Sequence, residues 1–358
     1  MTSFTGEVRI VGAGLLGTSI GLALTKQGID VAISSKSNKS VELAVSYGAG
    51  RAAHQDDSPR LIVVCVPPQL TAQIVSEELI AFPDAIVTDV ASVKVGILEE
   101  LERLAAPIER YVGSHPMAGR ERGGAIAGRA DLFVGRPWVI TPNAKSDPAG
   151  IKLVSDLASA LESSIVTVSP KDHDRAVALV SHVPQLVSSL LAARLVDAKK
   201  DDVALAGQGL RDTTRIAASD PDLWVQILEA NSAEVLKVLE ALASDLVNVI
   251  GALQNVHAEH GMTQLRHALE AGNIGVEKIP GKHGSKHSTY AQIIVMIDDQ
   301  PGELARLLTE VGEIGINLEE LKLEHSPSAQ IGLVELQVVP EAEASLIADL
   351  QKRGWRIA

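Results

Sequence analysis

The sequence predicts an α/β protein: a parallel sheet covered by helices, then an all-helical segment, then a small domain of the order βαββαβ. Short Val and Ile runs alternate with helical patterns in the first part of the chain, and this strand signal stops at Ser169. Strand patterns return near the C-terminus in a new, ferredoxin-like rhythm. We therefore expect domains over residues 1–168, 169–285 and 286–358.

The strands of the first domain are predicted from apolar runs rich in Val and Ile. Continuous runs of this kind are typical of strands buried on both faces, hence of a parallel sheet between two layers of helices. With only 3% aromatic residues in a chain that is 46% hydrophobic, the cores must consist of Ala, Val, Leu and Ile. The predicted strands are residues 8–12, 31–34, 61–66, 85–90, 110–115 and 137–141.

The segment that follows shows apolar residues at helical spacing from Ser169 to about Leu253. These apolar stripes are too extensive for a lone bundle, so we expect this segment to form a homodimer. Residues 254–288 begin as a polar helix and end as a Gly, Lys and His linker. Residues 289–358 then carry four strand patterns and two helical ones in the order βαββαβ.

Composition excludes several classes of partner. The net charge of −13 argues against binding to nucleic acid or to an anionic membrane. Cys65 is the single cysteine, which predicts a reducing compartment, and no apolar stretch approaches the roughly 20 residues of a membrane span. The N-terminus lacks a signal-peptide pattern, so we expect a cytoplasmic protein. His257, His260 and His267 have no nearby cysteine, and we expect no metal site.

A glycine motif follows the first strand, in the stretch VRIVGAGLLGTSIGLAL. Gly12, Gly14 and Gly17 form the pattern G-x-G-x-x-G between a strand and a helix. The first glycine permits a tight turn, the second lets backbone approach a pyrophosphate, and the third lets helix and strand pack closely. The helix N-terminus at Leu15 and Leu16 favours phosphates. The motif predicts a Rossmann-like domain that binds NADP or NAD.

The end of the second strand favours NADP. An acidic residue usually stands there and bonds the ribose 2′-hydroxyl of NAD. This chain has Ser34, Ser35 and Lys36 instead. Hydroxyls and an ammonium accept a 2′-phosphate, which a carboxylate would repel. The alternative is that Lys36 is a solvated loop lysine and that NAD binds through backbone contacts.

Two further stretches follow strands, where doubly wound sheets bind their ligands. TDVASVK offers Asp89, Ser92 and Lys94, and GSHPMAG offers His115. Histidine is the side chain best suited to take a proton near neutral pH, and a nearby hydroxyl can orient it. The alternative for His115 is a histidine that merely fits a turn. Glu121 is either a gate or ion-pair partner, or a solvated loop carboxylate.

The helical segment offers cationic side chains for an anionic substrate. Arg211 and Arg215 are spaced i, i+4, which places them on one helix face, with Asp212 and Trp224 near them in sequence. Two guanidinium groups on one face can bind a dicarboxylate. The alternative is two solvated arginines paired with neighbouring acids. His182 lies upstream in the stretch SHVPQ.

Together these stretches resemble the prephenate/arogenate dehydrogenase family of tyrosine biosynthesis, over essentially the whole chain. The resemblance implies oxidative decarboxylation of prephenate to 4-hydroxyphenylpyruvate with hydride transfer to NAD(P), or alternatively arogenate dehydrogenation, which gives tyrosine directly. It also implies a homodimer formed by the helical domain. The matching stretches are GAGLLGTS at 12–19, DVASVK at 89–94, GSHPMAG at 113–119, HD at 173–174, SHVPQ at 181–185 and LRDTTRIAASDPDLW at 210–224.

The resemblance implies a role for each candidate residue. His115 matches the histidine that accepts the proton of the substrate ring hydroxyl, and Ser92 matches a serine that bonds this hydroxyl and helps orient the histidine. Arg215 matches the arginine that binds the ring carboxylate. His182 and Arg211 match positions near the substrate side chain, although some relatives carry lysine in place of Arg211. The other matching pocket residues are Glu121 at the entrance, Asp212 and Trp224.

The C-terminal segment resembles an ACT domain, a small amino-acid-sensing module. DDQPGELARLL at 298–308 matches the first turn and helix start, and Gly315, Ile316 and Asn317 match the second turn. The resemblance implies tyrosine or phenylalanine as an effector. The alternative is a dimerising module without a ligand, because motif and function are separable.

Two more distant interpretations remain. A β-hydroxyacid dehydrogenase shares a nucleotide domain followed by helices, but that class generally relies on a catalytic lysine in the helical domain, and GSHPMAG and the arginine pair fit it poorly. A non-catalytic nucleotide or amino-acid sensor would combine a nucleotide fold with an ACT module. The joint presence of Ser92, His115 and Arg215 counts against a sensor, which would not need all three.

Overall fold

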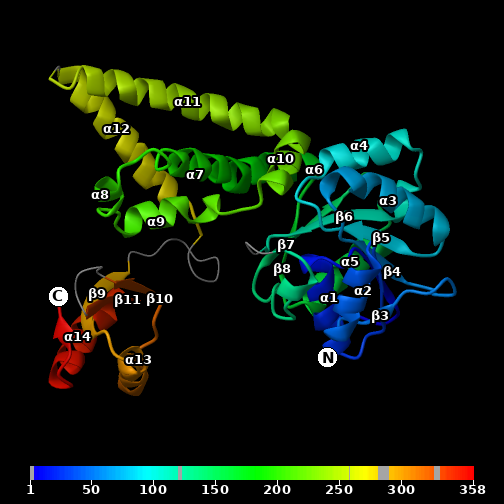
Figure 1. Cartoon of the computed structure of the whole chain (residues 1–358), viewed down its shortest axis with the longest axis horizontal. Helices are drawn as coiled ribbons and strands as arrows, with labels where there is room; N and C mark the ends of the chain where they lie inside the picture. The colour runs from blue at the N-terminus through cyan, green and yellow to red at the C-terminus, as the bar shows by residue number, and fades with distance from the viewer. Residues whose placement is uncertain (1–3, 120–122, 258, 281–289, 326–330) are drawn as a thin grey trace. The chain divides into compact units, whose positions relative to one another are not determined.

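A computed structural model describes residues 4–119, 123–257, 259–280, 290–325 and 331–358 (Figure 1). The chain divides into two compact units, Met1–Ala243 and Ser244–Ala358. The first unit holds a large sheet with its helices and most of the helical segment. The second unit holds a small sheet and the remaining helices. The long helix α11 (Ser232–Gln254) runs across the division between the two units.

The first unit is built on an eight-stranded sheet of order β3-β2-β1-β4-β5-β6-β7-β8. All the strands predicted from Val and Ile runs are present. Two strands were not predicted: β3 has only two residues, and β8 is an edge strand with exposed side chains. The strands are β1 (Val8–Val11), β2 (Val31–Ser34), β3 (Arg51–Ala52), β4 (Leu61–Val64), β5 (Ile86–Asp89), β6 (Tyr111–Pro116), β7 (Pro137–Pro142) and β8 (Ser164–Thr167).

The expectation of an entirely parallel sheet is wrong at one pair of strands. β6 and β7 run antiparallel, with His115 opposite Val139, whereas the other neighbouring strands of this sheet are parallel. Parallel strands need a long crossover, usually a helix. Among the described residues between β6 and β7, the helical structure is the single turn η2 (Ala125–Ala127), so the chain returns in the opposite direction.

Helices cover both faces of this sheet. One core joins strand side chains to α1 and α5, and a second core joins strand side chains to α3 and α4. This explains why β4 is buried at every position and reads as an uninterrupted apolar run. The helices are α1 (Leu15–Lys26), α2 (Asn38–Ser46), α3 (Pro68–Ala81), α4 (Val95–Arg103) and α5 (Pro148–Ala160).

The segment after β8 is all-helical, as predicted. It begins with one continuous run in which α6 (Pro170–Val177) passes into α7 (Val183–Ala193) through the π-helical turn η3 (Ala178–His182). Turns of this kind are rare and occur frequently at functional sites. The remaining elements of this unit are α8 (Lys200–Val203), α9 (Gln208–Thr214), η4 (Arg215–Ala217) and α10 (Pro221–Ala230).

The continuous run Pro170–Ala193 differs from the expectation that no apolar stretch is long enough to span a membrane. Within the described ranges it is the one helix that passes this test of length and composition. The run also carries His173, Asp174 and His182, all of which are buried inside the first unit. These buried polar contacts are typical of a helix that packs within a globular protein.

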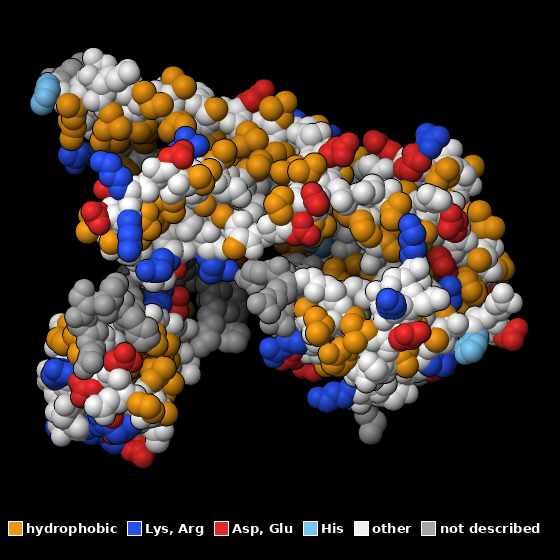
Figure 2. Space-filling view, viewed as in Figure 1, with side chains coloured by type: hydrophobic (Ala, Val, Ile, Leu, Met, Phe, Trp, Pro, Cys, Tyr) orange, Lys and Arg blue, Asp and Glu red, His pale blue; other side chains and the backbone are white. Residues whose placement is uncertain are grey.

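Large apolar side chains lie exposed on α7 and α11, the helices that were predicted to form a dimer. Leu190 on α7 is 64% exposed, and Val247 on α11 is 66% exposed. Hydrophobic side chains follow α11 along its visible face (Figure 2). Exposed apolar surface of this extent is typical of an interface. The exposed large hydrophobic residues of α11 are Leu236, Leu242, Leu246, Val247, Ile250 and Leu253.

The second unit contains the predicted βαββαβ order. Its sheet has the strand order β10-β11-β9-β12, and every neighbouring pair is antiparallel. The Trp355 ring closes the core: its Nε1 donates to Glu310 Oε2 over 2.8 Å, and Arg306 lies 3.8 Å above its centroid. The elements are α12 (Glu259–Val276), β9 (Ala291–Asp298), α13 (Glu303–Ile314), β10 (Glu320–His325), β11 (Ile331–Val338), α14 (Glu343–Lys352) and β12 (Arg356–Ile357).

Candidate active site

The turn between β1 and α1 has room for glycine alone at two positions. Gly12 has φ of +117°, and a Cβ atom there would lie 2.2 Å from the carbonyl oxygen of Cys65. A Cβ atom on Gly17 would lie 2.0 Å from the carbonyl oxygen of Gly12. Both distances are far inside van der Waals contact, so the tight turn and the close packing of helix on strand depend on these two glycines.

Gly14 has the opposite surroundings. A Cβ atom on Gly14 would meet no atom within 4 Å, so space is open beside the helix N-terminus. Gly14 is also the N-cap of α1, and no side chain of the described chain caps the helix at this residue. The N–H groups of the first turn, at Leu15 and Leu16, have no partner within the helix and point toward this end. The turn therefore fits the pyrophosphate of a dinucleotide.

Ser34 is the last residue of β2, next to this turn. Its carbonyl oxygen accepts the Gly12 N–H over 2.8 Å, and its Oγ is buried without a hydrogen-bond partner in the described part of the chain. Buried hydroxyls normally have a partner, so this one is available to a ligand. Ser35 is half-buried and Lys36 is exposed, which leaves the ammonium free to reach a phosphate.

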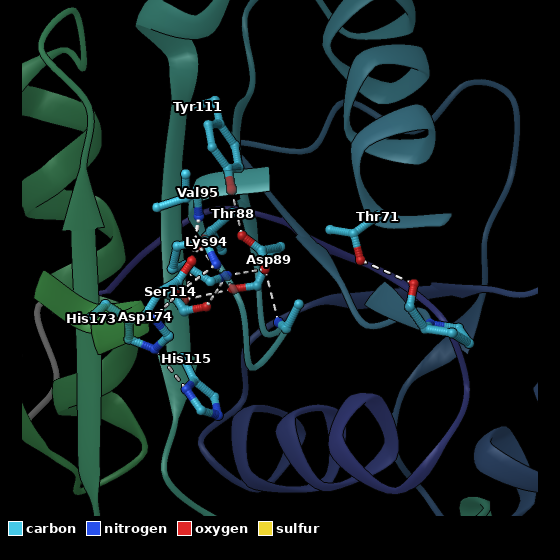
Figure 3. Close-up of polar contacts among 12 residues, drawn as sticks. Thr71, Thr88, Asp89, Lys94, Val95, Tyr111, Ser114, His115, His173 and Asp174 are labelled. Carbon is cyan, nitrogen blue, oxygen red and sulfur yellow. Dashed lines mark hydrogen bonds and ion pairs between the residues drawn. The ribbon is translucent and has the colours of Figure 1, made fainter. Parts of the chain in front are cut away.

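A buried ion pair anchors the loop that follows β5 (Figure 3). The side chains of Asp89 and Lys94 are 0% and 1% exposed, and Lys94 Nζ donates to Asp89 Oδ1. The same ammonium donates to the carbonyl oxygen of Ser114 over 2.8 Å, and the Tyr111 hydroxyl donates to Asp89 Oδ2 over 2.7 Å. Burial lowers the pKa of Lys94, and the Asp89 charge opposes this effect. The pair thus joins the loop of residues 90–94 to β6.

Gly113 in the motif GSHPMAG has a packing role in this network. A Cβ atom on Gly113 would lie 2.6 Å from Thr141 Oγ1, 3.0 Å from the Tyr111 hydroxyl and 3.4 Å from Lys94 Cδ. A side chain at this position would displace the groups that surround the buried ion pair. Glycine is therefore required here by close approach of its neighbours rather than by a turn.

His115 lies near the end of β6 and is joined to two residues of α6 (Figure 3). Its Nδ1 is 2.9 Å from His173 Nε2, and His173 Nδ1 is 2.7 Å from Asp174 Oδ1. Burial lowers the pKa of His115 well below its usual value, and His173, Lys94 and His182 add to this effect. His115 is therefore a neutral imidazole at neutral pH and can accept a proton.

Asp174 also caps the N-terminus of α4. The backbone N–H groups of Lys94 and Val95 donate to Asp174 Oδ1 and Oδ2 over 2.9 and 2.8 Å. This carboxylate satisfies two of the N–H groups that a helix leaves without partners at its start, and the positive end of the helix dipole favours its charge. One side chain thus links the loop containing Ser92 to His173.

His182 lies in the π-turn η3 and is 1% exposed. Its Nδ1 is 3.1 Å from Asn231 Nδ2, and the same Nδ2 donates to the backbone oxygen of Asp174 over 2.8 Å. The rings of His182 and Trp224 form a T-shaped contact, with ring centroids 6.1 Å apart. Burial lowers the pKa of His182 to about 4, against the opposing charge of Asp174, so His182 is neutral at neutral pH.

The next predicted site residues are Ser92, Arg211 and Arg215, which are half-buried or exposed. Ser92 is half-buried in the loop that Lys94 anchors. Arg211 is exposed on α9, which ends at Thr214, and Arg215 is exposed in the next element, η4. The two arginines therefore lie on consecutive helical elements, not on the single α-helix that their spacing predicted. Both elements pack against α7.

The last two predicted site residues are Asp212 and Glu121. Asp212 is exposed and accepts a hydrogen bond from Gln208 Nε2 over 2.7 Å, a contact within α9 that does not involve the histidines. Glu121 lies outside the described residues. The contacts of the described chain thus connect His115 and His182 through α6, while the arginines and Asp212 occupy the helical elements packed on α7.

Sequence reasoning missed the residues that connect the two histidines. The dipeptide HD is predicted only as part of the family resemblance, and no predicted site residue corresponds to Asn231. A signal for Asp174 was present: Asp174, Ala178 and His182 recur every four residues along an apolar helix pattern, and all three are buried. Polar residues on an apolar stripe indicate buried polar contacts. Asn231 follows α10 and has no comparable pattern.

Models of known families match two consecutive parts of the chain. The nucleotide-binding domain of prephenate dehydrogenase matches residues 20–167, and the dimerization domain of prephenate dehydrogenase matches residues 169–270. The probable prephenate dehydrogenase NovF of Streptomyces niveus is 34% identical over 353 residues, which cover 97% of this chain and 98% of that protein.

Solved structures agree with these matches. Arogenate dehydrogenase from Synechocystis is 31% identical with a TM-score of 0.64, over 76% of this chain and 99% of that chain. Prephenate dehydrogenase from Aquifex aeolicus, in complex with hydroxyphenyl propionate and NAD+, is 27% identical with a TM-score of 0.67, over 77% of this chain and 100% of that chain. This chain belongs to the prephenate dehydrogenase family.

Proposed function

We propose that this protein oxidises and decarboxylates prephenate to 4-hydroxyphenylpyruvate with NAD(P) as the hydride acceptor. The observation that carries the proposal is His115, a neutral imidazole near the carboxyl end of β6. β1, β4, β5 and β6 are parallel, so their carboxyl ends share one edge of the sheet with the glycine turn. Ligands of such sheets bind at this edge.

His115 acts as the general base in this proposal. It takes the proton of the ring hydroxyl, so that the hydroxyl oxygen forms a carbonyl as the hydride leaves the same carbon. A bound nicotinamide supplies the hydride acceptor. The bond to the ring carboxylate then breaks and its electron pair enters the ring, which becomes aromatic as CO2 leaves. His115 returns the proton to the oxygen, and the product carries a phenolic hydroxyl.

Ser92 and Arg215 assist in this scheme. Ser92 bonds the ring hydroxyl from the loop that Lys94 anchors, and Arg215 binds the ring carboxylate. Arg211, His182, Asp212, Trp224 and Glu121 complete the substrate site. A guanidinium suits a carboxylate because it donates two parallel hydrogen bonds. Its exposed position on η4 leaves Arg215 accessible to a substrate.

NADP is the preferred cofactor in this proposal. The buried Ser34 hydroxyl without a partner, Ser35 and the exposed Lys36 support it, because they offer donors and a positive charge to a 2′-phosphate. The NAD+ complex of the Aquifex aeolicus relative supports NAD as the alternative for this family.

Arogenate is the second candidate substrate, because the Synechocystis relative is an arogenate dehydrogenase. Arogenate carries an amino group where prephenate carries a keto group. Initial rates of reduction of NADP and NAD, with prephenate and arogenate in parallel, test the proposal. Higher kcat/KM with prephenate and NADP supports it. If folded protein that binds nucleotide turns over none of the four pairs, the proposal is wrong. The interpretations as a β-hydroxyacid dehydrogenase or a non-catalytic sensor then remain.

The chain is further proposed to act as a cytoplasmic homodimer with an amino-acid effector. The exposed apolar side chains of α7 and α11 support the homodimer. We assign residues 1–168 to nucleotide binding, 169–285 to substrate binding and dimerisation, and 286–358 to regulation. A thermal-shift titration with tyrosine and with phenylalanine tests the effector, and two flat titrations would favour a module without a ligand.

A further inference from the structure

Asp174 offers two acceptor groups, and each leads to a different histidine. Its carboxylate is 2.7 Å from His173 Nδ1, whose ring faces His115. Its backbone oxygen accepts the amide of Asn231 over 2.8 Å, and this amide faces His182. A carboxylate and a carbonyl only accept hydrogen bonds, so the direction of every bond that follows can be assigned from Asp174.

The first path ends at His115. Both oxygens of the Asp174 carboxylate accept a backbone N–H group at the start of α4, so this group acts as a hydrogen-bond acceptor. His173 Nδ1 must therefore carry a proton, and in the neutral ring His173 Nε2 must carry a lone pair. His115 Nδ1, 2.9 Å away, donates to that lone pair. In neutral His115 the other nitrogen, Nε2, is then the acceptor.

The second path ends at His182. Asn231 Nδ2 donates to the Asp174 backbone oxygen, which fixes the orientation of the amide. The second hydrogen of the same Nδ2 points toward His182 Nδ1 over 3.1 Å, so His182 Nδ1 is the acceptor. In neutral His182 the proton is therefore on Nε2, which makes this nitrogen a donor.

We propose that Asp174 is a positioning residue that gives the two histidines opposite roles: His115 accepts at Nε2 and His182 donates at Nε2. The inference rests on the proposed function, in which His115 faces the ring hydroxyl and His182 faces the substrate side chain. An acceptor suits the hydroxyl proton. A donor suits the keto oxygen of prephenate and not the ammonium group that arogenate carries in its place, so His182 discriminates in favour of prephenate over arogenate.

The tautomers can be measured directly by 15N NMR of the full-length protein labelled at histidine. His115→Asn and His182→Asn remove one ring each and so assign the signals. We expect the wild-type protein to carry a protonated Nδ1 on His115 and a protonated Nε2 on His182. A protonated Nε2 on neutral His115, or a protonated Nδ1 on His182, would overturn the proposal without reference to activity.

Kinetics of variants test the functional consequence. His173→Gln should lower kcat for prephenate by about 10- to 100-fold with KM changed by less than about threefold, because orientation of the base is lost while binding is kept. Asn231→Leu should reduce the preference for prephenate over arogenate about tenfold. Asp174→Asn should show the loss of kcat but keep the preference for prephenate, because the backbone oxygen that accepts the Asn231 amide remains, and its fold is checked by circular dichroism.

The matched control is Asp172→Asn, an exposed carboxylate on the same helix that pairs with Arg175. It should leave kcat, KM and both tautomers unchanged. If the wild-type enzyme is active and His173→Gln leaves kcat and KM unchanged, the positioning role is refuted while the proposed function stands. A wild-type protein without turnover, but with the expected tautomers, would instead refute the proposed function.

Discussion

The Lys94 ammonium and the Asp89 carboxylate form an ion pair that is fully buried between the ends of β5 and β6. Each partner has further hydrogen bonds, to Ser114, Tyr111 and the backbone of Ala91. Buried charges of this kind are stable only while every member of the group has its partners. The loop that carries Ser92 is held at both ends by this pair.

Removing one partner of this ion pair should strongly destabilise the fold. Lys94→Met leaves the Asp89 charge buried without its partner, and we expect a loss of about 3–5 kcal/mol in the free energy of unfolding. Urea denaturation measures this loss. Lys152→Met, which removes an exposed pair with Asp156, is the control and should cost less than about 1 kcal/mol. Equal losses would contradict the role of the buried pair.

His115→Asn should lower kcat for prephenate by about 10²–10⁴-fold, because general-base catalysis contributes a factor of this size. KM should change little, since the hydroxyl loses one hydrogen bond while the carboxylate contacts remain. Steady-state kinetics at saturating cofactor measure both values. His54→Asn, at an exposed loop position, is the control. A kcat close to that of the wild type would remove His115 from the mechanism.

Gly113→Ala should destabilise the protein by about 1–3 kcal/mol, because its Cβ atom would overpack the groups around Lys94. Gly96→Ala is the matched control. Gly96 lies in the first turn of α4, where an added Cβ atom would meet no atom within 4 Å, and alanine there should stabilise the helix by up to about 1 kcal/mol. Thermal unfolding measures the change in stability of each variant. If both variants are stabilised, or both are destabilised, this packing argument is contradicted.

Acidification should destabilise the fold through His182. Its pKa is lowered to about 4 by burial, whereas the unfolded chain binds this proton near pH 6.5. The contribution of His182 is thus complete above pH 6.5 and is lost as the pH falls toward 4, by roughly 3 kcal/mol in total. Urea denaturation between pH 4 and 8 measures the slope. His182→Gln should reduce this slope, of which the part due to His115 remains, and an unchanged slope would contradict the assignment.

Lys36→Glu should raise KM for NADP at least about tenfold, because a carboxylate repels the 2′-phosphate. KM for NAD should stay the same or fall. Lys39→Glu is the control, at an exposed position on α2. Steady-state kinetics with each cofactor at saturating substrate measure the change. A Lys36 variant that uses NADP as well as the wild-type protein does would support the interpretation of Lys36 as a solvated loop lysine.

Local sequence patterns predicted most of the fold because burial on both faces leaves a strong mark. The β4 run was predicted from its Val and Ile residues, and all of its positions are buried. The direction of β7 could not be predicted in this way. A strand has the same apolar pattern whichever way it runs, and its direction depends on the connection that precedes it. β8 lacked a buried face to mark it.

The sequence predicted only those parts of the candidate site that belong to a single local motif. His115 was placed by its strand end, and Gly12 and Gly17 by their spacing. The contact between His115 and His173 joins residues far apart in the sequence, and only the packing of α6 on the sheet brings them together. Arg215 lies beyond the end of α9, since the i, i+4 rule holds only while the helix continues.

The π-turn η3 sets a limit on how this family member can change in length. Each residue of an α-helix turns the chain by about 100°, so a one-residue deletion or insertion between Ala178 and His182 would rotate α7 by that angle relative to α6. Gln185 and Ser188, now buried, would then face a different direction. The number of residues in this turn is therefore fixed by the two helices that it joins.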